Sequence, residues 1–468
     1  MKWLLDVLVC IYTELPRILW VNSVPVVKRL YLLSREKHHY DIDSKKKLSL
    51  LINVILNGRI TMKITSIDVM KIPSPDVSFS GNGGGSTEEW SPIIVRINTD
   101  EGISGFGEAG LAYGKGWRAG YGMIQDFART IIGEDPMKIE KIWDKLQRTT
   151  YWGIAGGVVP NAAISAIDIA LWDIKGKYYR TPVYQLLGGK TNDHLRAYAS
   201  QLQYNWGTAP DPQLPKLSTP AEYADVARCV KAEGFTALKF DPIMWGDDPS
   251  KPWHTKGPLN HREIKIAYDR VKAIRDAVGP DFDIIIDMHA NTDTTAAIEY
   301  AHAFEPLHIL YYEEPVDPLN PNFYKIVRDK MPAEMAIAGG ERTFTRWGFR
   351  QMLEDRSIDI VQPDLTLAGG ISETKKICDM AYTYDISAQV HVCGSPIAIA
   401  AALQVEAVIP NFYIHEVYQR VMYTKDRAAA VYDDLVPVNG QVEVPDRPGI
   451  GQELKPAIIK QSLVQTID

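Results

Sequence analysis

The pattern of apolar and polar residues changes near residue 196, and this change divides most of the chain into two parts. The first part opens with two strand-like runs, 62–72 and 93–100, and continues with helical patterns. In the longest of these patterns apolar residues recur three and four positions apart, which is typical of a helix with a buried face. Strands followed by helices predict an α+β domain. The expected helices are 121–132, 138–147 and 160–178.

From residue 196 onward, strand-like and helix-like segments alternate. Short runs rich in β-branched and aromatic residues lie at 196–200, 237–242, 283–289, 309–315, 336–341, 358–364, 386–391 and 412–416. Helical patterns between them include 220–233, 260–278, 294–304 and 372–384. This rhythm predicts an α/β fold with a parallel (β/α) barrel. A doubly wound sheet is the alternative, but it would gather polar residues at one switch point, whereas here they lie at the ends of many strands.

Composition narrows the class of protein. The chain has 468 residues, of which 46% are hydrophobic, and its formal net charge is −7. Without a basic stripe it has no electrostatic basis for binding nucleic acid, and no apolar run reaches the roughly 18 residues of a membrane-spanning helix. The four cysteines form no CxxC pair, which argues against a disulfide framework and favours a reducing cytoplasm.

Residues 1–61 differ from the rest, with ten Lys or Arg against five Asp or Glu. Their opening has a faint likeness to a signal peptide, but Asp6 interrupts the apolar run and no small-x-small cleavage site follows. The run that begins at Met62 has the pattern expected at the start of a domain. We therefore expect residues 1–61 to be an extension outside the fold.

Three acids predict a site for a divalent metal. Asp287, Glu313 and Glu341 each end a predicted strand, and they are spaced 26 and 28 residues apart, the length of one strand-helix unit. In a barrel of such units their carboxylates converge at one mouth. Three oxygen ligands suit Mg²⁺ and leave half of an octahedral shell open to substrate. Arg342 is the expected charge partner of Glu341.

Neighbouring residues on the predicted strands add polar groups to this mouth. His289 follows Asp287 by two positions, so strand alternation predicts that both side chains point to the same side. Asn291 lies two further on and is a candidate contact to the substrate or the metal shell. Lys239 and Asp241 are likewise two apart, and they form either part of the functional site or a salt bridge within the barrel.

Asp364 and His391 end two successive predicted strands, so the two residues are expected to pair. An aspartate on one imidazole nitrogen fixes the tautomer and steadies the cation, which makes the other nitrogen a usable base near neutral pH. A histidine at a strand end taken alone is more often structural. Its combination with Asp364 and the three acids favours a role in proton transfer.

Several motifs together resemble the enolase superfamily, in its mandelate racemase and muconate lactonizing enzyme branch. They are YYEEP at 311–315, GGER at 339–342, QPDLTLAGG at 362–370, VHVCGSP at 390–396, and AISAIDIALWDIKGK followed by PVYQLLGG at 163–189. The resemblance implies an N-terminal α+β capping domain and a modified (β/α)7β TIM barrel. It also implies Mg²⁺ on Asp287, Glu313 and Glu341, with Glu416 helping to hold the substrate.

The expected domain boundaries follow from this resemblance. Residues 1–61 form the extension, 62–190 the capping domain, 191–416 the barrel, and 417–468 a C-terminal segment that returns to the capping domain. We expect a homo-oligomer, as in similar proteins. By analogy, the glycine-rich loop 81–85 and Tyr151-Trp152 would lie over the mouth of the barrel. A solvated loop without a role is an equal alternative for the glycines, and ordinary core packing is the favoured role for the aromatic pair.

One departure from the family pattern indicates the type of reaction. Racemases and cycloisomerases of this branch carry Lys-x-Lys on the second barrel strand, whereas this chain has Lys239 and Asp241. A histidine two residues after the first acid, as His289 is here, instead resembles the pattern of the acid-sugar dehydratases of the galactonate and mannonate type. The resemblance implies a sugar-acid substrate contacted by Glu416, and strand alternation adds Lys239, Asp241 and Asn291 as candidate contacts. His391, oriented by Asp364, would remove the C2 proton, and His289 would protonate the leaving 3-hydroxyl, or the two would act in reverse.

Two other functions are compatible with the sequence. The first is a racemase or epimerase of a 2-hydroxy acid that uses Lys239 and His391 as opposed bases. The second is a sugar-acid binding protein that keeps the barrel without turnover, although binding alone does not require the Asp364 and His391 pair. The identity and stereochemistry of the sugar acid do not follow from the sequence.

Overall fold

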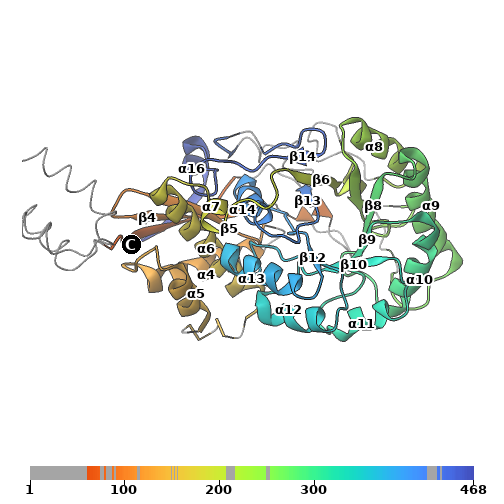
Figure 1. Cartoon of the computed structure of the whole chain (residues 1–468), viewed down its shortest axis with the longest axis horizontal. Helices are drawn as coiled ribbons and strands as arrows, with labels where there is room; N and C mark the ends of the chain where they lie inside the picture. Colours follow the sequence, from red (N-terminus) through yellow and green to blue (C-terminus); the bar gives the residue numbers. More distant parts are fainter. Residues whose placement is uncertain are drawn as a thin grey trace, which may run out of the picture. The chain divides into compact units, whose positions relative to one another are not determined.

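The computed structural model describes residues 61–73, 79–80, 87–88, 91–112, 116–148, 150–151, 153–154, 156–206, 217–248, 253, 255–418, 429–432 and 435–468. Met62–Asp468 is one compact unit (Figure 1). Apart from Thr61, the predicted extension lies outside the described residues, and so do the glycine-rich loop 81–85 and Trp152.

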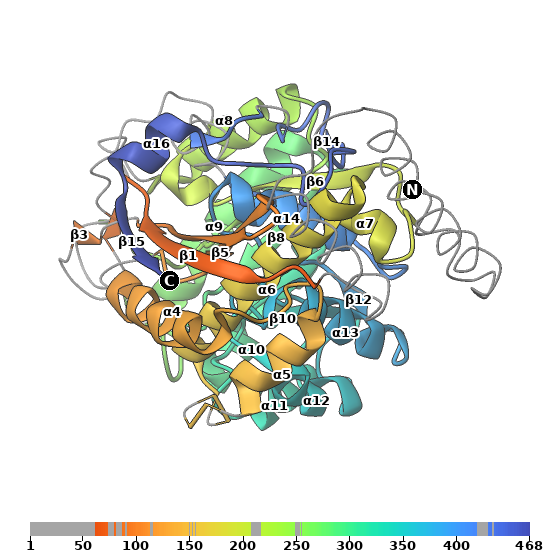
Figure 2. The same cartoon turned by 90° about the vertical axis from the view of Figure 1, so that its left-hand side faces the viewer.

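A four-stranded antiparallel sheet with helices lies at the beginning of the compact unit. Its strands, in the order β15, β1, β4 and β5, are Leu463–Ile467, Ile64–Lys71, Ile93–Thr99 and Ser104–Ala109. The accompanying helices are α4 (Trp117–Ile131), α5 (Ile139–Arg148) and α6 (Val158–Tyr179). Figure 2 shows β15, from the end of the chain, beside β1. The C-terminal segment thus completes a sheet that the N-terminal segment begins.

Helix α6 lies unusually close to β5, and two glycines make this possible. A Cβ atom on Gly105 would lie 2.2 Å from the backbone oxygen of Ala170, and one on Gly107 would lie 2.0 Å from that of Ala166. These distances are far below van der Waals contact, so any side chain on the two glycines would push the helix away. Because α6 is buried along most of its length, this close packing joins the sheet to the rest of the molecule.

Among the described residues, the second sheet has nine strands: β14 (Gln441–Val442) pairs antiparallel with β6, and the other eight are parallel. In order they are β6 (Leu195–Ser200), β7 (Ala237–Phe240), β8 (Asp283–Asp287), β9 (Tyr311–Glu313), β10 (Ala336–Gly339), β11 (Ile360–Val361), β12 (Ser387–Ala388) and β13 (His415–Tyr418). β13 pairs with β6, and a parallel bridge between Ala388 and Phe412 joins the β12 end to the segment leading into β13. These pairings close the sheet.

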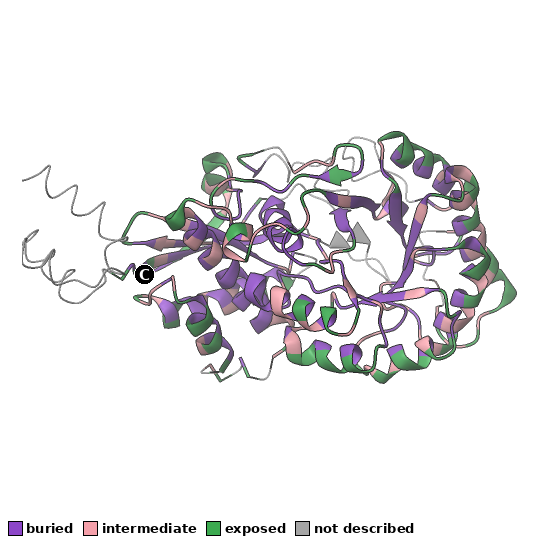
Figure 3. Cartoon of the chain, viewed as in Figure 1, coloured by how far each residue is buried: buried purple, intermediate pink, exposed green. Residues whose placement is uncertain are grey.

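A helix follows each of the first seven strands of this sheet. The helices are α8 (Pro220–Ala232), α9 (His261–Val278), α10 (Thr294–Phe304), α11 (Asn322–Arg328), α12 (Thr345–Glu354), α13 (Gly370–Tyr382) and α14 (Pro396–Glu406). On α8 to α12, Figure 3 shows buried residues facing the strands and exposed residues facing outward. All eight predicted strands coincide with observed ones, and the predicted (β/α)7β barrel class is confirmed.

Shorter elements complete the described structure. They are β2 (Phe79–Ser80), β3 (Thr87–Glu88), α7 (Val183–Leu186), η2 (Leu202–Tyr204), η3 (Glu305–Leu307), β14 (Gln441–Val442) and α16 (Pro456–Gln461). The core-packing prediction for Tyr151 is wrong, because this side chain is 83% exposed. Its apolar neighbours in sequence did not reveal that it lies on the surface.

Acids from the first part of the unit cap two barrel helices. Glu108 on β5 accepts hydrogen bonds from the backbone N–H groups of Ser395 and Ala398 at the start of α14. Asp168 on α6 accepts from the N–H and the hydroxyl of Ser372 at the start of α13. A carboxylate at a helix N-terminus satisfies free N–H groups and complements the helix dipole. The capping acids therefore attach α6 and β5 to the barrel.

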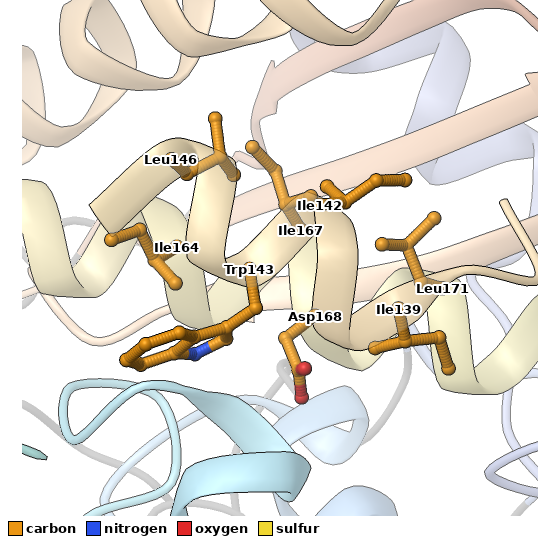
Figure 4. A pocket seen from close by; sticks show the side chains of 8 residues that line it. All are labelled: Ile139, Ile142, Trp143, Leu146, Ile164, Ile167, Asp168 and Leu171. Atoms are coloured by element: carbon orange, nitrogen blue, oxygen red, sulfur yellow. The ribbon is translucent and has the colours of Figure 1, made fainter. Parts of the chain in front are cut away.

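Both capping acids are buried, and burial raises the pKa of each to about 7 despite the hydrogen bonds they accept. For Asp168 the cause is visible in its surroundings. It lines a small pocket between α5 and α6 whose other lining side chains are apolar or aromatic (Figure 4). The walls, which include Ile142, Trp143 and Leu171, offer little solvation to a charge.

We predict that Glu108→Gln weakens the pH dependence of stability. Because native Glu108 holds its proton up to about pH 7, whereas the unfolded chain releases it near 4.5, its contribution is complete below pH 4.5 and is lost as the pH rises through 7. Urea unfolding at pH 5 and pH 8 should therefore show the wild type losing roughly 2 to 3 kcal/mol more than the variant. The exposed Glu334→Gln serves as control, and an unchanged pH difference in the Glu108 variant would contradict the prediction.

Candidate active site

A buried ammonium group lies among three carboxylates at the carboxyl ends of the barrel strands. Lys239 Nζ on β7 is 2.6 Å from Glu313 Oε1, 3.2 Å from Asp287 Oδ2 and 3.1 Å from Glu416 Oε1. All four side chains are at most 2% exposed. Asp287 ends β8 and Glu313 ends β9, whereas Glu341 follows the end of β10 by two residues. Consecutive parallel strands therefore bring these groups to one mouth.

Burial and the neighbouring charges together determine the protonation state of Lys239. Burial by itself favours the neutral amine, but Glu313, Glu416 and Asp287 outweigh it and raise the pKa of Lys239 well above its usual value. Burial and the neighbouring Asp287 raise the pKa of Glu313 to about 8. The three acids thus stabilise Lys239 as an ammonium ion, which balances part of their negative charge.

His289 forms one acid-histidine pair. Its Nδ1 lies 2.9 Å from Asp241 Oδ2, and its Nε2 lies 3.3 Å from both Asp287 Oδ2 and Gln201 Nε2. Burial opposes protonation, but Asp287 and Asp241 outweigh it and raise the pKa of His289 to about 9. The predicted proximity to Asp287 is present, although its cause differs. β8 ends at Asp287, and His289 has a left-handed backbone with φ of 46°, so a turn places the ring rather than strand alternation.

His391 forms a second such pair, as the sequence predicted. Its Nδ1 lies 2.8 Å from Asp364 Oδ2, and the two residues also form a parallel backbone bridge. Its Nε2 lies 3.0 Å from Glu341 Oε2 and 3.8 Å from Glu416 Oε2. Burial opposes protonation, yet Glu341, Glu416 and Asp364 raise the pKa of His391 well above its usual value. Thr366 holds Asp364 Oδ1 through its N–H and hydroxyl.

The three acids predicted to bind metal are suited to Mg²⁺ by donor type, because this ion prefers carboxylate oxygens. Glu313 Oε2 is buried and has no hydrogen-bond partner among the described residues, so it is open to a cation. As the described side chains lie, no three His, Cys, Asp or Glu residues form a group that could hold one ion. Lys239 and His391 contact the carboxylates instead. The three carboxylates therefore suit Mg²⁺ by chemical type. In the present arrangement the side chains of Lys239 and His391 neutralise part of their charge instead.

Two predicted substrate contacts have other partners in the structure. Lys239 pairs with Asp287, Glu313 and Glu416, as described, so the expected alternative of a salt bridge to Asp241 does not describe it. Asp241 directs Oδ2 to His289 and accepts the backbone N–H of Ile243 at Oδ1. Both of its carboxylate oxygens are thus engaged, which makes Asp241 the partner of a histidine.

The remaining predicted contacts lie at the edge of this group. Glu416 accepts hydrogen bonds from the Ser200 hydroxyl and the Val392 N–H, and its role toward substrate stays a prediction. Asn291 lies in the turn after β8, where its carbonyl accepts from the Thr255 hydroxyl. Arg342 pairs with Glu341, as predicted, and also with Glu314.

Sequence reasoning missed the pairing of Asp241 with His289 and the contact of Gln201 with the same ring. A usable signal existed for the first. Asp241 follows β7 and His289 follows the adjacent β8, which is the arrangement that revealed Asp364 and His391 on β11 and β12. No pattern in the sequence marked Gln201, because it lies in an irregular segment after β6.

Comparison with known proteins agrees with this fold. Two family models match: the N-terminal domain of mandelate racemase / muconate lactonizing enzyme over residues 80–188, and the enolase C-terminal domain-like family over residues 222–458. The chain is 32% identical to a D-galactonate dehydratase of Variovorax paradoxus, over 77% of this chain and 88% of that protein. It is 33% identical to a D-xylonate dehydratase of Haloferax volcanii, over 80% of this chain and 85% of that protein.

Solved structures give the same result. A member of the enolase superfamily from Salmonella Typhimurium has a TM-score of 0.81 and 47% identity, covering 87% of this chain and all of that one. A mandelate racemase/muconate lactonizing enzyme from Sulfitobacter has a TM-score of 0.73 and 29% identity, covering 86% and 95%. The chain belongs to the mandelate racemase and muconate lactonizing enzyme family of the enolase superfamily, and it is an enzyme of the hydro-lyase class. Among the described residues, no helix has the length and apolar character needed to cross a bilayer.

We predict that Lys239→Met strongly destabilises the protein. The substitution keeps the length of the side chain but leaves Asp287, Glu313 and Glu416 buried without their ammonium partner. Breaking a buried ion pair from one side costs about 3 to 5 kcal/mol of unfolding free energy, which urea titration at pH 7.5 would measure. Lys265→Met removes an exposed pair with Asp269 and should change stability by less than about 1 kcal/mol. Equal stability of the two variants would show that the ammonium does not neutralise the site.

Proposed function

We propose that the protein is a Mg²⁺-dependent sugar-acid dehydratase that converts an aldonate or aldarate into a 2-keto-3-deoxy acid. The names of the relatives support this class of substrate, since they are dehydratases of galactonate and xylonate. The geometry supports the type of reaction. The observation that carries the proposal is the presence of two acid-histidine pairs that face each other across the barrel.

The position of the pairs follows from strand order. Asp241 and His289 follow β7 and β8, whereas Asp364 and His391 follow β11 and β12. In a closed sheet of eight strands, positions four strands apart lie on opposite walls. A substrate between them meets one proton-transfer group on each side. Elimination of water needs this equipment, because one group must remove a proton from carbon while another protonates the departing oxygen.

Asp287, Glu313 and Glu341 would hold the metal ion. When bound, Mg²⁺ supplies positive charge for the second negative charge that develops on the substrate carboxylate as the C2 proton leaves. The protein adds its own positive charge from Lys239, which lies against two of these acids. Neutralising Glu341 would also lower the pKa of His391 from its raised value, because Glu341 is the strongest of the charges that raise it.

Each of the two histidines carries out one of the two proton transfers. His391 receives the C2 proton at Nε2, because Asp364 occupies Nδ1 and fixes the ring. The electrons of the C2–H bond form a C2–C3 double bond, and the C3–O bond breaks. His289 donates its Nε2 proton to that oxygen, which leaves as water, and the resulting enol becomes the 2-keto-3-deoxy acid. Asp241 on Nδ1 keeps the cationic ring of His289 in place before the transfer.

The racemase alternative lacks the usual second lysine, because Asp241 takes its place in the Lys-x-Lys pattern and is engaged by His289. Lys239 itself lies against Asp287, Glu313 and Glu416, so its ammonium group is paired with these acids. A protein that only binds sugar acids would require neither of the two ordered acid-histidine pairs. A dehydratase, by contrast, needs both pairs, one for each proton transfer.

A substrate panel tests the proposed function. Purified protein is incubated with hexonates, pentonates and aldarates, with 5 mM Mg²⁺ or with EDTA, and 2-keto acid formation is measured. We expect one group of related acids to react in Mg²⁺ and none in EDTA. Turnover that persists in EDTA would contradict the metal requirement, and racemised substrate without 2-keto acid would replace the dehydratase by an epimerase.

We predict that the two histidine variants separate the two proton transfers. His391→Asn should lose both C2 exchange in D₂O and product formation, by about 10²-fold or more, because no base remains. His289→Asn should still exchange the C2 proton while product formation falls by a similar factor. Proton NMR of the recovered acid and of the product measures both rates.

Exposed His261→Asn on α9 is the matched control and should behave as wild type. If the two active-site variants exchange their phenotypes, the roles of the histidines are reversed. If His391→Asn retains wild-type exchange and product formation, neither assignment holds.

A further inference from the structure

Gln201, at the end of β6, has a backbone conformation that residues with side chains rarely adopt. Its φ is 67° and its ψ is 39°, in the left-handed region. Glycine would adopt this conformation without strain, whereas a side chain there costs on the order of 1 kcal/mol or more. Such strain is retained where the side chain has a use. Gln201 is half-buried and follows the carboxyl end of β6, the end of the barrel at which the other site residues lie.

The amide of Gln201 has a fixed orientation. Its Oε1 accepts a hydrogen bond of 2.6 Å from Nε2 of Gln203, a fully buried side chain whose own Oε1 accepts the backbone N–H of Asp241. Because the oxygen is engaged, the NH₂ group must point the other way, toward His289 Nε2 at 3.3 Å. Gln203 thus hydrogen-bonds to both Gln201 and Asp241, and each of these two residues contacts the ring of His289.

We propose that Gln201 is a substrate-positioning residue whose amide N–H binds the oxygen of the hydroxyl group that leaves the sugar acid. The inference rests on the proposed dehydratase function. The side-chain nitrogens of Gln201 and His289 lie 3.3 Å apart, so one oxygen atom can lie within hydrogen-bond distance of both. A hydroxyl oxygen has two lone pairs. It accepts the Gln201 N–H with one and takes the His289 proton with the other.

This arrangement explains why a strained glutamine is placed beside the proton donor. The Gln201 N–H holds the C3–O bond with its oxygen against His289, which aligns the proton transfer. It takes no part in removal of the C2 proton, because His391 acts from the opposite wall. Loss of Gln201 should therefore slow departure of the hydroxyl while carbanion formation continues.

The test compares exchange with elimination in Gln201→Met, which keeps the side-chain length and removes the donor. The substrate is an acid that the wild type dehydrates, and the reaction runs in D₂O with Mg²⁺. NMR measures two quantities: the deuterium at C2 of the recovered substrate, which reports exchange, and the amount of 2-keto acid, which reports product formation. We expect product formation to fall by about ten- to a hundredfold, and the ratio of exchange to product to rise by at least about tenfold. Gln203→Met, which frees the Gln201 amide from its anchor, should change the ratio in the same direction by a smaller factor.

Gln351→Met, exposed on α12, is the matched control and should leave both rates unchanged. A Gln201 variant with an unchanged ratio overturns the inference, whether its two rates stay at the wild-type level or fall together as in a structural defect. Circular dichroism of each variant establishes that it is folded. Absence of exchange and of product in the wild type with every acid of the panel would instead overturn the proposed function, and the inference with it.

Discussion

The structure depends on balancing negative charge at the barrel mouth. Asp287, Glu313 and Glu416 are almost completely removed from water, and an isolated buried carboxylate costs several kcal/mol unless a cation or a proton accompanies it. Lys239 supplies the cation to all three at distances of 2.6 to 3.2 Å. Even so, the pKa of Glu313 remains raised to about 8, so one lysine does not fully compensate the acids. Because Lys239 leaves part of the negative charge uncompensated, the site suits a divalent cation. With that cation bound, the site also suits an anionic substrate whose negative charge increases during the reaction.

The segment after β11 connects this chemistry to the first part of the compact unit. Asp364 orients His391, and Thr366 both binds Asp364 and accepts the backbone N–H of Gly110 through its carbonyl. Three residues further on, Gly369 receives a hydrogen bond from the indole of Trp143 and donates its N–H to the hydroxyl of Ser165 on α6. The segment that orients His391 is thus hydrogen-bonded to α5, to α6 and to the residue after β5, all in the first part of the unit.

The sequence was sufficient for the fold because the signals are local and repeated. Eight strand-like runs at regular spacing predict a barrel, and the capping boxes that begin α8 and α9 are legible as Thr219 with Glu222 and Asn260 with Glu263. The carboxylate and histidine positions at the strand ends followed from that regularity. What escaped prediction lies outside regular elements: the exposure of Tyr151, and the left-handed Gln201, whose placement depends on contacts between segments distant in sequence.

The two acid-histidine pairs differ in how the fold positions them. His391 and Asp364 form a backbone bridge in the parallel sheet, so the register of adjacent strands sets the pair directly. His289 instead lies in a turn with positive φ, and this turn is fastened to the neighbouring strand, because the Met288 N–H donates to the carbonyl of Glu313. Glu313 also contacts Lys239. Glu313 thus contributes its side chain to the charge balance at the mouth and its backbone carbonyl to the position of the His289 turn.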